Sequence, residues 1–341
     1  MPHPLFDTRQ FPRRAPALLA PLALFAACLP APIPTTPPAF DLKPPSLVEA
    51  GPTGLRSFVL RFDEEVRPVE GSFEIEPGES GEAPTATAEG GDLKLELGAD
   101  QVAGKDYKLL GEVVDGGGNG SRFLLSFAGF NAHPARLRIA EVLTAKNSSQ
   151  KNPHRDFVEF EVLAAGNLGG LEFSASSSTK TVTWTFPGAE VSAGELIVLH
   201  CSPEGSAAER DEAGTDLEGS GGIDASAARD FWSKAGPLPD ATGVLVLSES
   251  PGGKPMDGLF YADSAKEGPV GEGRIEGLVQ GLVDFGLWAT VAAPAWEDAF
   301  RWKPSSSRSI VRAGFGKEPG SEPGGTEWTL SATGGQTPGF R

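Results

Sequence analysis

Residues that could act as metal ligands or as catalytic groups are few in this sequence. Their spacing does not match a known metal site or catalytic triad. The chain of 341 residues has four histidines, and His133, His154 and His200 lie far apart, without the short spacings of zinc sites. Ser220 lies in a glycine-rich segment that suits an exposed nucleophile, but a catalytic triad also needs a His base and an Asp. No such pattern surrounds His133 or His154. We therefore expect Ser220 in a flexible loop, and we expect no enzyme, no catalytic residues, no metal and no cofactor.

Two groups of oxygen ligands raise the alternative of calcium binding. Asp115 and Asn119 offer one carboxylate and one amide oxygen, whereas calcium takes six or more oxygen ligands, so we favour a turn there. A second group has irregular spacing and no glycine-centred loop, which favours a solvated acidic surface. Its members are Glu209, Asp211, Glu212, Asp216, Glu218 and Asp224. A calcium-dependent adhesion module stays open as an alternative, and so does an accessory or cryptic hydrolase, because only the fold sets the separation of two carboxylates.

The composition bounds the fold class and the partners. A net charge of −17 without a basic stripe argues against nucleic acid, because such binding depends on Lys and Arg that neutralise phosphates. The 44 Gly and 30 Pro beside 20 Phe favour short strands joined by tight turns. Because the chain is longer than a typical single domain, we expect an all-β protein with two antiparallel β-sandwiches.

The first 27 residues have the layout of a signal peptide. A basic patch with Arg13 and Arg14 precedes the apolar run Ala15–Ala27, which is too short to span a bilayer. The residues Leu24–Cys28 resemble the lipobox of bacterial lipoproteins, although Phe25 stands where that motif usually has Leu. The resemblance implies that Cys28 carries a lipid and anchors the protein to a membrane. Cleavage at an ordinary signal-peptidase site, with release of a soluble protein, is the alternative.

Residues 28–43 follow as a proline-rich tether. Such a segment extends as polyproline II and acts as a semi-rigid spacer. Leu29 and Pro30 lack the Asp that resembles an inner-membrane retention signal, so we expect an outer-membrane lipoprotein of the cell envelope. The protein would be secreted or periplasmic if Cys28 were not lipidated.

The region 44–130 shows strand-like alternation in runs such as Phe58–Phe62 and Phe123–Phe127, with Gly and Pro turns between them. We expect about seven short strands. The order of its features resembles the SbsA-type Ig-like domain of bacterial S-layer and surface proteins. The matching residues are Pro44–Ser46, Leu60–Val66, Gly104–Tyr107, Val114 with Asp115, Gly118 with Asn119, and Phe127.

The region 134–341 is a second set of alternating runs, which predicts another sandwich with one buried face on each sheet. Its residues resemble the lamin-tail domain, an Ig-like sandwich. The match comprises Ile139–Val142, Asp156–Phe160, Asn167–Leu171, Val191–Leu199, Gly253, Met256–Tyr261, Ser307–Arg312, Trp328–Leu330 and Gln336–Gly339. Two inserts, 203–240 and 264–303, depart from that pattern.

The second insert has apolar residues at helical spacing, which predicts a small helix that packs on the sheet. They are Ile275, Leu278, Val279, Leu282 and Val283. We favour core positions over a binding rim for Trp288, Trp296 and Trp302, and we expect Cys201 to be a buried apolar residue. These features together predict a non-catalytic envelope lipoprotein that presents Ig-like modules for structural attachment or for binding a protein or a surface.

Overall fold

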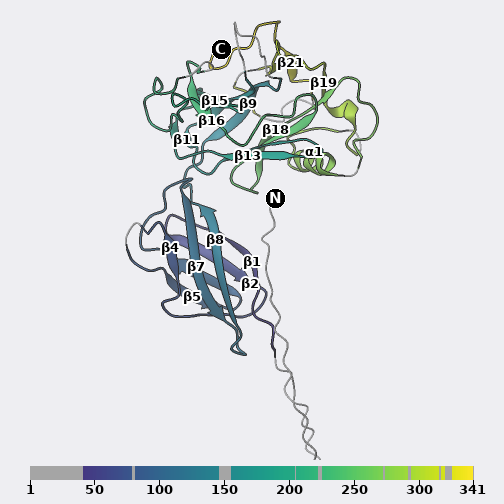
Figure 1. Cartoon of the computed structure of the whole chain (residues 1–341). Coiled ribbons are helices and arrows are strands. Elements are labelled where there is room, and N and C mark those ends of the chain that lie inside the picture. Colours follow the sequence, from purple (N-terminus) through teal and green to yellow (C-terminus); the bar gives the residue numbers. More distant parts are fainter. Residues whose placement is uncertain are drawn as a thin grey trace, which may run out of the picture. The chain divides into compact units, whose positions relative to one another are not determined.

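The computed structural model describes residues 41–78, 81–145, 155–203, 205–221, 225–271, 273–290, 293–314, 316–318 and 325–340. Within these ranges the protein consists mainly of β-strands joined by turns, with one α-helix and one short 3-10 helix (Figure 1). Most neighbouring strands are antiparallel, and the sheets pack as β-sandwiches, so the predicted all-β sandwich fold is confirmed. The predicted signal peptide, Cys28, residues 28–40 of the predicted tether and His154 lie outside the described residues.

The first sandwich has two sheets of four strands each. One sheet has the order β1-β2-β6-β5, and in the other β7 pairs with β8 along one edge and with β3 and β4 along the other. The strands are β1 (Leu47–Pro52), β2 (Ser57–Phe62), β3 (Arg67–Pro68), β4 (Glu74–Glu76), β5 (Thr85–Glu89), β6 (Asp92–Glu96), β7 (Asp106–Val114) and β8 (Gly120–Ala128). These are eight strands where about seven were expected, because a strand as short as β3 leaves no alternation to detect.

Alternation along the strands builds the core of the first sandwich. Phe58 and Leu60 of β2 are buried, and so are Leu93 and Leu95 of β6. The residues between them point to the other face, because successive side chains of a strand lie on opposite sides of the sheet. Leu109 of β7 meets this cluster from the opposing sheet.

The second sandwich has a six-stranded and a five-stranded sheet. The six-stranded sheet contains β16 (Arg229–Trp232), β15 (Leu196–His200), β10 (Phe157–Ala164), β9 (Arg136–Leu143), β20 (Ile310–Arg312) and β21 (Trp328–Leu330), in that order. The five-stranded sheet contains β13 (Thr181–Thr185), β12 (Glu172–Ser176), β17 (Gly243–Ser248), β18 (Pro255–Asp263) and β19 (Phe300–Trp302). A small separate pair joins β11 (Gly166–Asn167) to β14 (Glu190–Val191). Large apolar residues of both sheets form one core, in which the rings of Phe160 on β10 and Phe173 on β12 lie 5.6 Å apart.

Both inserts return to the sheets as parallel edge strands. The first insert contributes β16, which pairs parallel with β15, and the second contributes β19, which pairs parallel with β18. A parallel pair needs a long crossover connection, and each insert supplies one. The sandwich is therefore antiparallel except at one edge of each sheet.

The predicted helix is present as α1 (Arg274–Asp284; Figure 1). It packs against β17 and β18. Its residues Ile275, Val279 and Leu282 are buried. Gly258 of β18 makes room for this contact, because a Cβ atom at that position would lie 2.5 Å from a methyl carbon of Leu282. The helix therefore belongs to the core of the second sandwich.

The aromatic residues of the second insert lie mainly in the core. Trp288 and Trp302 are buried, and Trp296, at the start of the 3-10 helix Trp296–Asp298, is partly buried against the same cluster. Cys201 is buried as expected, and this burial raises the pKa of its thiol well above the usual range. Among the described residues no helix is long and apolar enough to cross a membrane.

Candidate functional site

The most deeply buried charges join the two sheets of the second sandwich. The guanidinium group of Arg312 on β20 makes two hydrogen bonds to the carboxylate of Asp257 on β18, at 2.5 and 2.8 Å. Both side chains are 0% exposed, and Arg312 also contacts Glu327 at 3.1 Å. Asp257 accepts a further hydrogen bond from the backbone N–H of Ile139. This arrangement ties β20, β18 and β9 together by charge-assisted bonds, which are the stronger kind.

Glu327 completes this group from the loop before β21. The pKa of its carboxyl group is raised overall. Burial is the largest cause, and the nearby Arg312 opposes it. Arg312 in turn lies over the ring of Trp328, at 4.4 Å from its centroid. The group is thus a structural cluster in which one guanidinium group serves two carboxyl groups.

Two buried glutamates hold the C-terminal segment against the six-stranded sheet. Glu141 of β9 and Glu159 of β10 are directly opposite each other in the sheet and are both nearly inaccessible. Glu141 accepts hydrogen bonds from the hydroxyl group of Ser309 at 2.5 Å and from that of Thr337 at 2.9 Å. Glu159 accepts one from the backbone N–H of Gly339 at 2.7 Å. Like charges opposite each other in a sheet are unfavourable, and these donors offset that cost.

Glu161, the next carboxylate on the same face of the sheet, is also held by hydrogen bonds. Glu161 of β10 accepts a hydrogen bond from the guanidinium group of Arg138 at 2.7 Å, and both side chains are 2% exposed. It also accepts one from the backbone N–H of Gly316. Glu141, Glu159 and Glu161 therefore bind three loop segments to the face of the sheet that lies away from the main core.

His200 belongs to a second buried polar cluster at the edge of this sheet. Its Nε2 atom lies 3.0 Å from Oδ1 of Asp230, and its ring stacks on Trp232 with 4.0 Å between the centroids. Asp230 also accepts hydrogen bonds from the backbone N–H and the hydroxyl group of Ser226. The hydroxyl group of Ser226 donates to the same Asp230 oxygen that His200 contacts, so the three residues do not have the Ser-His-Asp order of a nucleophilic triad.

The acidic insert is only partly solvated, which corrects one expectation. Glu212 is buried, and its carboxylate accepts hydrogen bonds from the backbone N–H groups of Asp230 and Ser220. Ser220 itself accepts a hydrogen bond from the indole N–H of Trp232 at 2.8 Å. Glu212 and Ser220 therefore attach the insert to β16. Asp211, Asp216 and Glu218 are exposed as predicted. Glu209 is half-buried and accepts hydrogen bonds from the backbone N–H groups of Gly205 and Ser206, and Asp224 lies outside the described residues.

The other polar residues singled out from the sequence have local partners. His133 is exposed, and its Nε2 atom lies 3.1 Å from a carboxylate oxygen of Glu190. Asp115 accepts two hydrogen bonds from Asn119, one from the backbone N–H and one from the side-chain amide, both at 2.7 Å. These bonds lower the pKa of Asp115, the side-chain bond of Asn119 being the largest cause. They also close the turn between β7 and β8, in agreement with the turn interpretation.

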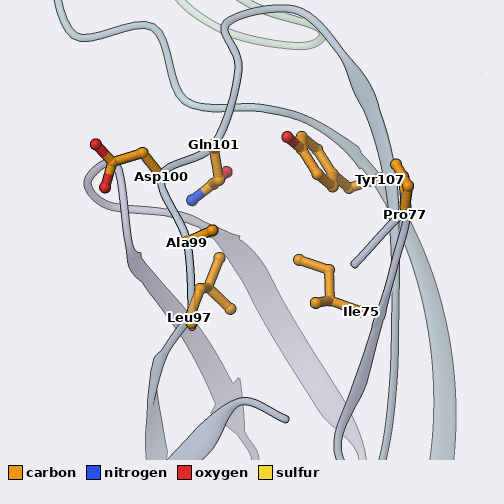
Figure 2. Close-up of a pocket in the computed structure, with 8 residues that line it drawn as sticks. Ile75, Pro77, Leu97, Ala99, Asp100, Gln101 and Tyr107 are labelled. Carbon is orange, nitrogen blue, oxygen red and sulfur yellow. The ribbon is translucent and has the colours of Figure 1, made fainter. Parts of the chain in front are cut away.

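One small pocket lies at an end of the first sandwich. In Figure 2, Ile75 and Tyr107 face Leu97 and Ala99 across it, and Gln101 lies at its rim. The amide group of Gln101 is engaged by the backbone carbonyl of Gly54 and the backbone N–H of Phe130. The space holds about one water molecule, so it offers a gap in the packing and no room for a substrate.

The sequence did not reveal that these glutamates and arginines are buried. Alternation places Glu141, Glu159 and Glu161 away from the apolar core, and that side of a sandwich sheet is ordinarily wet. Only hydrogen-bond donors far along the chain, such as Ser309 and Thr337, could have indicated that loop segments shield this face of the sheet from solvent. The residues that carry the lamin-tail resemblance include most of these partners.

Comparison with known proteins places the second sandwich in a family. A relative from Treponema pallidum (strain Nichols), described as an uncharacterized protein, is 32% identical over 168 residues, which is 48% of this chain and 42% of the relative. The chain thus matches less than half of that relative's length. Residues 135–330 match a family model described as "protein second domain". That match spans more than half of the chain, so the chain belongs to the family described as "protein second domain".

Proposed function

We propose that this protein is a non-catalytic lipoprotein of the bacterial cell envelope, which presents its sandwiches for structural attachment or for binding a protein or a surface. A lipid on Cys28 anchors it, residues 28–43 form the tether, residues 44–130 an SbsA-type Ig-like domain, and residues 134–341 a lamin-tail-like domain. Its place is the outer membrane. Without the lipid it would be secreted or periplasmic.

One observation carries the non-catalytic part of this proposal. In the second sandwich the side chains best suited to acid–base chemistry use their polar atoms to hold the fold. His200 binds Asp230, Glu141 binds Ser309 and Thr337, and all of them are shielded from solvent except Thr337. An active site needs such groups to converge on a space that a substrate can enter.

The proposed lipid anchor is inferred from the sequence around Cys28. The basic patch, the apolar run Ala15–Ala27 and the small pair before Cys28 are the features that direct export and lipid attachment. Sandwiches suit the role because their loops gather at the two ends, where they are available to a partner.

Membrane fractionation of the full chain and of its Cys28→Ala variant tests the anchor. We expect the wild type in the membrane fraction, with a diacylglyceryl-modified N-terminal peptide by mass spectrometry, and the variant in the soluble fraction. Ala26→Gly, which keeps a small residue before Cys28, is the matched control and should stay in the membrane. Unmodified Cys28 in a soluble wild-type protein would reject the assignment.

A further inference from the structure

The strand β8 is an unusual sheet edge. It has nine residues and pairs with β7 residue by residue from Gly120 to Ala128 without a bulge. Among the described strands, none pairs with its other side. It contains no Pro and one charged residue, Arg122. An edge strand that is long, regular and almost uncharged is a template for pairing with another chain.

The other sheet edges are protected in recognisable ways. β1 has a bulge between Leu47 and Glu49 and ends at Pro52. The described strands at the remaining edges have five residues or fewer, as in β5, β13, β16, β19 and β21. Short length, bulges and prolines are the devices that prevent unwanted pairing. β8 has none of them.

An apolar patch continues from β8 across the outer face of its sheet. Leu124 is 61% exposed and lies opposite Leu110 of β7. The two leucines line a shallow groove together with Glu74. Beside them Arg122 forms an ion pair with Glu112 at 2.6 Å, which neutralises the charge next to the patch.

We propose that β8 pairs antiparallel with β8 of a second copy of this chain, about a two-fold axis at Leu124. The strand is complementary to itself in this register. Leu124 meets Leu124 of the second copy, so that Leu110 and Leu124 of both copies form one continuous row of four leucines. Arg122 lies opposite Ser126 and Phe123 lies opposite Leu125, so no like charges face each other. A symmetric contact of this kind closes as a dimer.

Self-association is independent of the lipid anchor and of the binding role proposed above. A second copy is favoured over an unrelated strand because β8 is complementary to itself in this register: its one charged residue, Arg122, lies opposite Ser126, and Leu124 lies opposite Leu124. The backbone bonds of nine paired residues and the leucine row act together, since main-chain bonds give affinity and side chains give register in such contacts.

Sedimentation velocity of the full chain, in an excess of density-matched detergent micelles, tests the proposal. We expect a twofold larger protein mass for the wild type than for Leu124→Lys, because a charge on an exposed edge opposes pairing. The matched control is Val48→Lys on the protected edge β1, where the side chain is 64% exposed, and it should keep the wild-type mass. A wild type that sediments as a single chain at about 100 µM, or an unchanged mass for Leu124→Lys, would overturn the proposal.

Cysteine cross-linking tests the register on its own. Directly opposed residues of antiparallel strands have Cβ atoms about 4.5–5.5 Å apart, and the shorter of these separations reaches the range of about 3.5–4.5 Å that a disulfide spans. Leu124→Cys should therefore give several-fold more oxidised dimer than Val48→Cys or the wild type, each of which also carries Cys28 and Cys201. Arg122→Cys and Ser126→Cys should each cross-link poorly alone and well when the two variants are mixed. Equal cross-linking of Leu124→Cys and Val48→Cys would contradict the pairing.

Discussion

The two sandwiches place their charges differently. In the first, ion pairs lie on the surface, as Arg61 does with Glu49, where the side chains are 54% and 70% exposed. In the second, Arg312 and Asp257 are wholly buried. The first sandwich is held by its apolar core, and solvent hydrates most of its charges, with the carboxylate of Asp115 as a buried exception. The second has a sheet covered on both faces, so that every buried charge needs a partner and thereby fixes the position of a loop.

The tryptophans make this comparison measurable, because all six lie in the second sandwich. They are Trp184, Trp232, Trp288, Trp296, Trp302 and Trp328. Tryptophan fluorescence therefore reports the unfolding of the second sandwich, whereas far-ultraviolet circular dichroism reports both.

The largest effect is expected from Arg312→Met. This change leaves the carboxylate of Asp257 buried without its partner, which costs about 3–5 kcal/mol of unfolding free energy. The midpoint of urea unfolding, followed by tryptophan fluorescence, should fall accordingly. Arg136→Met is the control, because Arg136 pairs with Glu318 on the exposed surface of the second sandwich. A loss of less than about 1 kcal/mol would show that the buried cluster does not organise the second sandwich.

A truncated side chain in the apolar core of the first sandwich tests the same comparison in that sandwich. Leu60→Ala in β2 removes a side chain that is 0% exposed, and such changes cost about 2–5 kcal/mol. The circular dichroism transition should shift to lower urea, while the fluorescence midpoint stays within error of the wild type. A shift of both by the same amount would mean that the sandwiches unfold as one cooperative unit.

The fold was more predictable than the positions of these charges. Alternation in segments such as Phe58–Phe62 indicated strands, and the spacing from Ile275 to Val283 indicated the helix, because both depend on neighbours along the chain. The parallel pairing of β16 and β19 depends on contacts across long inserts, which no local pattern records. The burial of Glu141 depends on Thr337, almost two hundred residues away, and alternation alone places such a side chain in water.

The cover of the six-stranded sheet is tested by Glu141→Gln. The neutral amide keeps the shape but loses charge-assisted hydrogen bonds to Ser309 and Thr337, and bonds to a charged group contribute about 1.5–3 kcal/mol. We expect faster amide hydrogen exchange in residues 331–340 and a modest fall in the fluorescence midpoint. Glu190→Gln on the exposed surface of the second sandwich is the control, because that side chain is 65% exposed. Unchanged exchange near Thr337 would mean that other contacts hold the C-terminal segment.

The response to acid should have opposite signs in the two sandwiches. The pKa of Glu327 is raised by burial, so its contribution to stability is present below its unfolded-state pKa and is lost as the pH rises through its folded-state pKa. The pKa of Asp115 is lowered by its bonds to Asn119, so its contribution is present above its unfolded-state pKa and is lost as the pH falls through its folded-state pKa.

Urea midpoints between pH 7 and pH 3 can separate these two effects. Relative to Glu327→Gln, the wild type should gain stability as the pH falls, when followed by fluorescence. Relative to Asp115→Asn, the wild type should lose stability over the same change, when followed by circular dichroism. The same sign for both pairs would show that burial does not control the protonation of Glu327.

The smallest effect is expected from Arg61→Met, the surface counterpart of Arg312→Met. Arg61 bridges Glu49 and Asp92 across three neighbouring strands at 2.9 and 3.0 Å. Solvent screens such pairs, so we expect a smaller fall in the urea midpoint than for Arg312→Met or Glu141→Gln, and this fall should shrink further in about 1 M salt. A cost close to that of Arg312→Met would mean that the first sandwich also depends on its charges, since the two variants differ mainly in whether water can replace the missing guanidinium group.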